Sequence, residues 1–162
     1  MNNRTSGIVS LLLLFSAGQA VADSGKYEMV YAFVTTYISI PHAAGTVTAG
    51  GNRGSVTVID STDSLFAKGQ SSAQECVVFG TRSSKGLDFV SECTMTDSGG
   101  DKVFHHAVRK TGDVSQGNAV GVNDIVGGTG KYEGIRGHCT YTVQLLPESR
   151  GVSTVTCDWQ KP

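Results

Sequence analysis

The sequence predicts an all-β protein, either an antiparallel barrel or a sandwich, and we prefer an eight-stranded barrel that is closed or nearly closed. About eight short segments rich in β-branched and aromatic residues are separated by Gly-rich turns. No amphipathic segment is long enough to form a helix that would cover a sheet. A closed barrel also removes the unpaired edge strands that a sandwich would expose, and this favours the barrel.

Residues 1–22 have the layout of a secretory signal peptide. Arg4 precedes the apolar run Ile8–Phe15, and small residues follow up to Ala20-Val21-Ala22, an A-x-A cleavage pattern. The apolar run is far shorter than the roughly 20 residues of a membrane-spanning helix, and no later segment approaches that length. We therefore expect no membrane span, cleavage after Ala22, and one exported domain over residues 23–162, in the periplasm or outside the cell.

Charge and cysteine content exclude several classes of partner. The chain has 13 basic and 14 acidic side chains. Without Arg4, which belongs to the expected signal peptide, the remaining chain has 12 basic and 14 acidic residues and a net charge of −2. It has no block of like charge, so we expect no nucleic-acid partner. Four cysteines in an exported chain, with no C-x-x-C spacing, indicate two disulfides. We expect neither a metal nor a cofactor.

The first half of the domain reads as strands separated by loops. In Lys26–Ile40, β-branched and aromatic residues occupy both alternating positions, which predicts a long strand covered at least partly on both faces. Pro41 is expected to end it. The Gly-rich segment Ala43–Gly54 predicts a loop or a frayed edge, and Ser55–Asp60 resumes the alternation of a strand. The polar segment Ser61–Glu75 predicts a loop, with a short strand near Leu65 and Phe66 as an alternative.

Two hairpins place pairs of cysteines opposite each other. Cys76 and Cys93 lie equally far from the centre of the turn between them, and Cys139 and Cys157 are symmetric about Glu148. We therefore prefer the disulfides Cys76–Cys93 and Cys139–Cys157 over the other two connectivities. The expected strands are Cys76–Thr81, Leu87–Cys93, Cys139–Leu146 and Arg150–Trp159.

A third hairpin is expected between these two, turning through the acidic, Gly-rich segment Asp97–Asp101. If Ser98 pairs with Asp101, Cys93 lies opposite His106, which then points inward. The inward face on this register comprises Leu87, Phe89, Cys93, Met95, Phe104, His106 and Val108, and the outward face includes Asp88, Glu92, Lys102, His105 and Arg109.

His106 is the candidate catalytic residue. An inward imidazole beside a disulfide could act as a general base or hydrogen-bond a ligand near neutral pH. The alternative is a buried histidine that a neighbouring carbonyl or hydroxyl satisfies. His105 and His106 face opposite sides of the strand and cannot chelate one metal together, and Asp97 and Asp101 lack the spacing of a calcium loop.

Four aromatic residues are candidates for lining the barrel interior and contacting a ligand: Tyr27, Tyr31, Phe104 and Tyr141. They could equally fill the barrel without any ligand. A small eight-stranded barrel can be packed with side chains or hold one small molecule. The sequence leaves both states open.

The Gly-rich segment Ile125–Tyr132 follows a polar turn at Thr111–Asn118 and an expected strand at Ala119–Val126. A phosphate-binding loop would need Gly five residues before Gly130 and Ser or Thr after Lys131, and neither is present. The glycine spacing is also one residue too long for a dinucleotide-binding fingerprint. We interpret the segment as a turn through glycines, with Lys131 facing solvent.

This segment, with Gly134 and Gly137 after it, resembles the Gly-Gly-Thr-Gly-Lys-Phe/Tyr segment of the allene oxide cyclase and dirigent superfamily. Cys93–Asp101 resembles a hairpin of its bacterial exported members, and the likeness extends loosely over Lys26–Trp159. The resemblance implies an eight-stranded, calycin-like barrel whose interior holds an apolar small molecule. Members include cyclases that need no cofactor and dirigent proteins that steer the coupling of phenoxy radicals; none of their catalytic residues can be matched here one by one.

The expected function is binding of a small hydrophobic ligand inside an exported, disulfide-braced barrel, monomeric or a homo-oligomer. A cofactor-independent cyclase or isomerase is the alternative. A non-catalytic structural or interaction protein with a filled interior and an exposed apolar patch is the second alternative. Fold alone does not decide among them, because one barrel hosts many functions.

Overall fold

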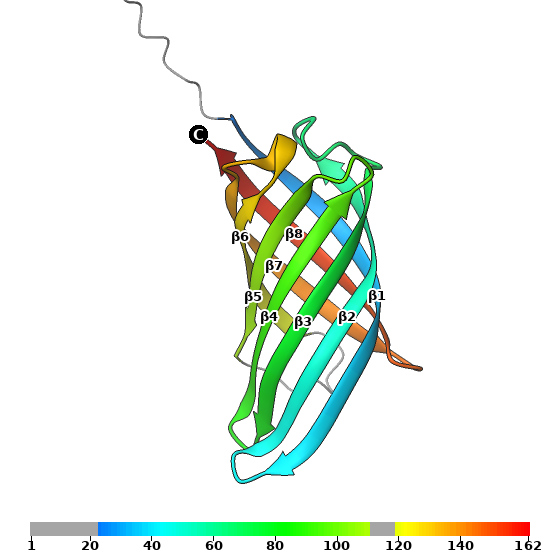
Figure 1. The fold of residues 1–162 in the computed structure, drawn as a ribbon, viewed down its shortest axis with the longest axis vertical. Coiled ribbons are helices and arrows are strands. Elements are labelled where there is room, and N and C mark those ends of the chain that lie inside the picture. Colours follow the sequence, from blue (N-terminus) through cyan, green and yellow to red (C-terminus); the bar gives the residue numbers. More distant parts are fainter. Residues whose placement is uncertain (1–22, 111–118) are drawn as a thin grey trace, which may run out of the picture.

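The computed structural model describes residues 23–110 and 119–162, which form a closed barrel of eight antiparallel strands. Each strand pairs with its neighbours in the sequence, and β1 pairs with β8 to close the barrel (Figure 1). The expected signal peptide and the turn at Thr111–Asn118 lie outside the described residues. Within those ranges, no helix is long and apolar enough to cross a membrane.

The predicted fold class is therefore confirmed, and of the closed and nearly closed forms the structure has the closed one. A short 3-10 helix, η1, lies between β6 and β7. The elements are β1 (Asp23–His42), β2 (Gly45–Ser61), β3 (Ser71–Ser83), β4 (Gly86–Asp97), β5 (Lys102–Arg109), β6 (Ala119–Gly128), η1 (Gly130–Tyr132), β7 (Arg136–Leu146) and β8 (Arg150–Lys161).

The strands β2 and β3 extend into segments that the sequence predicted as loops. Residues 45–54 pair with β1 on one side and with β3 on the other, and residues 71–75 belong to β3. Pro41 does not end β1 but lies opposite Thr46. The glycines of this segment permit close contact between strands, because a Cβ at Gly54 would collide with the carbonyl oxygen of Ala32.

Side chains alternate between the barrel interior and its outer surface. Val34 and Ile38 are exposed, so the expectation that this long strand is covered on both faces was wrong. The barrel wall is a single layer of sheet, whose outer face meets solvent. The inward residues of β1 that are buried are Tyr27, Met29, Tyr31 and Phe33.

One end of the barrel is closed by an aromatic cluster. Phe66, from the loop between β2 and β3, is fully buried and stacks on Tyr27, with ring centroids 4.0 Å apart. It also stacks on Tyr132 of η1 at 5.2 Å and meets Trp159 of β8 edge-on at 5.9 Å. These four residues are called the aromatic plug below. Figure 1 shows the β2–β3 loop and η1 at the same end of the barrel.

The Gly-rich segment forms the corner that carries Tyr132 into the aromatic plug. Gly130 has a φ of 56°, a left-handed conformation that suits glycine. Lys131 does not simply face solvent as expected, because its Nζ lies 2.6 Å from Oδ2 of Asp97, whose side chain is only 3% exposed. The segment is thus a structural corner locked to the β4–β5 turn by an ion pair.

Hydrogen bonds within this corner satisfy both oxygens of the Asp97 carboxylate. Its Oδ1 accepts hydrogen bonds from the N–H groups of Gly99 (2.8 Å) and Asp101 (3.1 Å), and its Oδ2 accepts one from the Tyr132 hydroxyl (3.3 Å). Burial raises the pKa of Asp97, but hydrogen bonds and the Lys131 charge outweigh it and hold the pKa below its usual value. Asp97 is therefore a structural anion.

Both predicted disulfides are confirmed. Cys76 and Cys93 are directly opposed on β3 and β4, and Cys139 and Cys157 are directly opposed on β7 and β8. The symmetry of each pair about its turn was therefore the correct guide. All four cysteines point into the barrel and are buried.

The predicted register of the β4–β5 hairpin was wrong by one residue. Cys93 lies opposite His105, not His106. The turn contains three residues between Asp97 and Asp101, and Gly100 adopts a left-handed φ of 90°, which is the geometry of a three-residue hairpin loop. A slip of one residue turns every side chain of a strand to the opposite face.

This slip reverses the predicted orientation of five residues on β5: Phe104, His105, His106, Val108 and Arg109. His105 is buried and faces inward, whereas His106 lies outside, with its Nδ1 2.7 Å from Oε1 of Glu92. Phe104 also lies on the outer face, contrary to its expected place in the interior. Arg109, expected outside, lines the interior.

Candidate functional site

The barrel interior contains a cavity of about 440 Å³ that opens to solvent on one side, where the lining residues Tyr37 and Leu145 are exposed. It lies between the aromatic plug and the barrel end that carries the β1–β2, β3–β4 and β7–β8 turns. Its apolar lining consists mainly of Met29, Phe33, Val78, Phe89, Ala107, Val143, Leu145, Val155 and the Cys76–Cys93 disulfide. Its polar lining includes Tyr31, Tyr37, Ser39, Thr46, Thr48, Asn52, Gln74, Ser91, Asn123, Tyr141 and Ser153. The described barrel is therefore not packed solid.

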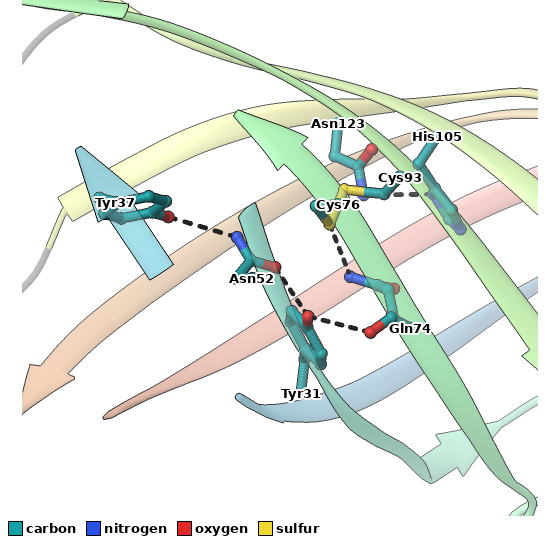
Figure 2. The surroundings of a disulfide bond; sticks show 8 residues. All are labelled: Tyr31, Tyr37, Asn52, Gln74, Cys76, Cys93, His105 and Asn123. Atoms are coloured by element: carbon teal, nitrogen blue, oxygen red, sulfur yellow. Dashed lines mark hydrogen bonds between the residues drawn. A yellow bond between two sulfur atoms is a disulfide. The ribbon is translucent and has the colours of Figure 1, made fainter. Parts of the chain in front are cut away.

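One wall of the cavity carries a hydrogen-bonded group of tyrosines. The Tyr31 hydroxyl donates to Oδ1 of Asn52 at 2.7 Å, and Nδ2 of Asn52 donates to the Tyr37 hydroxyl at 3.4 Å. Figure 2 shows these side chains in line, with the backbone of Gln74 as a second acceptor for Tyr31 at 3.3 Å. We call Tyr31, Asn52 and Tyr37 the tyrosine wall.

The phenols of this cavity are protonated near neutral pH, as an ordinary tyrosine is, and burial raises their pKa further. Desolvation raises the pKa of Tyr31 and of Tyr37 above the ordinary value for tyrosine, although their hydrogen bonds oppose the shift. Burial also raises the pKa of Tyr141, against the opposing charge of Arg109. Near neutral pH these hydroxyls are therefore neutral hydrogen-bond donors.

His105 lies beside the Cys76–Cys93 disulfide and contacts the cavity through Asn123 (Figure 2). Nδ2 of Asn123 donates to Nδ1 of His105 at 3.3 Å, so the proton of the neutral imidazole is on Nε2, which has no partner among the described residues. Burial lowers the pKa of His105 to about 4. This histidine is neutral near pH 7 and is a poor proton acceptor there.

Two arginines supply the charge in the cavity lining. Arg82 lies near the end of β3 and Arg109 is the last residue of β5, both at the end away from the aromatic plug. Desolvation and the neighbouring charge of Arg82 lower the pKa of Arg109, against the effect of Tyr141. A guanidinium nevertheless stays protonated near neutral pH. The cavity therefore has a cationic end.

The structure brings together some of the predicted site residues and separates others. Tyr31 and Tyr141 line the cavity. Tyr27 is inside the barrel but belongs to the aromatic plug. Phe104 and His106 lie on the outer face, so the orientation on which the catalytic hypothesis for His106 depended was wrong.

Three residues of the site were missed. Tyr37 has the same alternation as Tyr31, and this parity could have indicated it. Asn52 lies in the segment expected as a loop, and Arg109 was assigned to the outer face by the incorrect register. No group of three or more His, Cys, Asp or Glu side chains in the described ranges could hold a metal ion.

Comparison with known proteins gives a likeness at the level of the fold. No protein-family model matches the chain, and no curated protein matches it. Among solved structures, the chain is similar to the pterocarpan synthase dirigent protein GePTS1, with a TM-score of 0.52 and 16% sequence identity over 86% of this chain and 87% of that one. The chain thus has a dirigent-like barrel fold.

Proposed function

We propose that this chain is an exported barrel of the allene oxide cyclase and dirigent type that binds one small, mainly apolar molecule in its interior. The cavity of about 440 Å³ carries the proposal. Pockets for small molecules typically measure about 300–1,000 Å³. The size fits one ligand and supports binding over a purely structural role.

The lining of the cavity supports the same function. Apolar side chains of Met29, Phe33 and Val155 form its walls near the aromatic plug, and the tyrosine wall supplies a few fixed polar groups. Mostly apolar surfaces with a small number of placed hydrogen-bonding groups are typical of ligand sites. The disulfide Cys76–Cys93 fixes two of the strands that form this site.

Export is part of the proposal. Two disulfides in a domain of this size are typical of proteins that fold in an oxidising compartment. The signal-peptide pattern in residues 1–22 supports export, and mature protein from the secreting cell is expected to begin at Asp23. N-terminal sequencing of that protein tests the cleavage site; a chain that retains residues 1–22 would contradict it.

Binding is tested with N-phenyl-1-naphthylamine (NPN), a neutral apolar dye that fluoresces when it leaves water. Wild-type protein is expected to bind one NPN per chain. Ala107→Phe places a large ring in the cavity, because Ala107 lines it, and should abolish binding. Val108→Phe, the adjacent outward position on β5, is the matched control and should leave binding unchanged. Equal binding by both variants would place the dye outside the barrel and refute the proposal.

A cofactor-free cyclase or isomerase is the second candidate, favoured by the tyrosine wall. Neutral phenols inside an apolar cavity can donate hydrogen bonds to an oxygen on which charge develops. Small molecules that stay bound through native purification can be identified by mass spectrometry and then tried as substrates. Tyr37 is the residue to test, because its hydroxyl accepts from Asn52 and keeps its own proton free, whereas Tyr31 donates its single proton to Asn52. Conversion to a product of equal mass should fall about 10²-fold or more in Tyr37→Phe; equal conversion by wild type and variant would exclude this role for Tyr37.

A further inference from the structure

The cavity carries positive charge without a matching negative one. Arg82 and Arg109 line it, and no Asp or Glu side chain is among its lining residues in the described part of the chain. Both arginines lie at the same end, since β3 and β5 run in the same direction away from the aromatic plug. The apolar walls around Met29 and Val155 lie nearer the plug. The cavity therefore has its positive charge at one end, where Phe89 and Leu145 also line it, and an apolar wall nearer the plug.

Arg109 is the key side chain in this arrangement. Its Nε and Nη2 atoms are buried, yet neither has a hydrogen-bond partner among the described residues. Two buried N–H donors of a half-buried guanidinium that lack partners are unfavourable, because their desolvation is not offset by hydrogen bonds. Burial lowers the pKa of Arg109, and the nearby positive charge of Arg82 lowers it further, against the effect of Tyr141. An anion between the two would relieve both effects.

We propose that the ligand is an amphipathic carboxylate, with its head group on the Arg109 guanidinium and its apolar part extending toward the aromatic plug. This rests on the proposed function and specifies its substrate class. A carboxylate matches the planar donor pair of a guanidinium and can accept from Nε and Nη2 together. The hydroxyl of Tyr141, which also lines the cavity, is a further donor near the same end.

The test compares octanoate with 1-octanol, which share a similar chain and differ in the head group. Calorimetric titration at about pH 7 keeps the acid ionised. Wild-type protein should bind octanoate at least about tenfold more tightly than octanol, because charge-assisted hydrogen bonds are stronger than neutral ones. Arg109→Met retains the apolar stem and removes the charge, so it should bring octanoate to the affinity of octanol without weakening octanol.

Lys85→Met is the matched control for general electrostatic attraction. Lys85 is an exposed cation in the β3–β4 turn at the same end of the barrel, and its loss should leave octanoate affinity unchanged. Equal wild-type affinities for octanoate and octanol would overturn the proposal without any variant. If NPN binds wild-type protein in the cavity but octanoate shows no advantage, the carboxylate inference fails and the binding function stands. If neither NPN nor octanoate binds wild-type protein, the proposed function fails and the carboxylate inference fails with it.

Discussion

Replacing Phe66 with Ala should remove the centre of the aromatic plug and destabilise the whole barrel. Phe66 is fully buried and contacts three other rings, with centroids 4.0, 5.2 and 5.9 Å away. Truncating a buried Phe to Ala costs about 3–5 kcal/mol, including the cavity that it leaves. The dense ring contacts lead us to expect about 4 kcal/mol, or roughly 12–16 °C in Tm at about 3–4 °C per kcal/mol for a domain of this size.

The assay is urea denaturation followed by the fluorescence of Trp159, the single tryptophan of the chain, which meets Phe66 in the plug. Phe79→Ala is the matched control, because it removes the same side chain from β3 at a position that is 60% exposed. It should change the free energy of unfolding by no more than about 0.5 kcal/mol. A loss below about 1 kcal/mol for Phe66→Ala would refute the inference that the plug closes a packed core.

Three further predictions concern charge and cross-links. The pKa of Asp97 is lowered in the folded state, so the ionised carboxylate contributes to stability above the unfolded pKa of 3.8, and this contribution is lost as pH falls through the folded pKa. Asp97→Asn should therefore lower Tm at neutral pH and make Tm less dependent on pH in acid. Replacing Cys139 and Cys157 by Ala should cost about 3 kcal/mol of unfolding free energy, measured by urea denaturation, because the bridge closes a loop of 18 residues; no loss would contradict a stabilising bridge. The pKa of His105 falls from 6.5 to about 4 on folding, so His105 stabilises the fold fully above pH 6.5 and progressively less down to about pH 4; its imidazole NMR signals should stay constant from about pH 5 to 8, and a midpoint near 6.5 would contradict its burial.

The sequence was sufficient for the fold because alternation and turn symmetry are local properties. Cys76 and Cys93 are each the same distance from their turn, so a direct pairing follows from counting residues. The same count works for Cys139 and Cys157. Alternation in β8 likewise places Trp159 inside. Such signals need no knowledge of contacts between distant parts of the chain.

The site could not be derived in full, because it depends on backbone details that the residue types leave open. Whether the turn after Asp97 has two or three residues depends on the conformation of Gly100, and that choice decides whether His105 or His106 faces inward. The long pairing of β2 depends on β1 and β3 on both sides, so Asn52 could not be placed from its own segment. Arg109 faces the interior because of the same one-residue difference in register that turns His105 inward.

The aromatic plug could not be predicted from local sequence patterns either. Phe66 lies in a polar segment that has no periodicity, and its burial depends on Tyr132, which is 66 residues away in the sequence. The ion pair between Lys131 and Asp97 is another contact of this kind. Long-range contacts of loops decide which end of the barrel is closed, and hence where the cavity lies.

The most direct test of ligand binding in the barrel is a crystal structure of the wild-type protein grown with NPN. Binding in the interior predicts electron density for the dye between Met29 and Arg109, in contact with the tyrosine wall. Side chains that fill this space, with the dye absent or bound on the outer face of the barrel, would contradict the proposal.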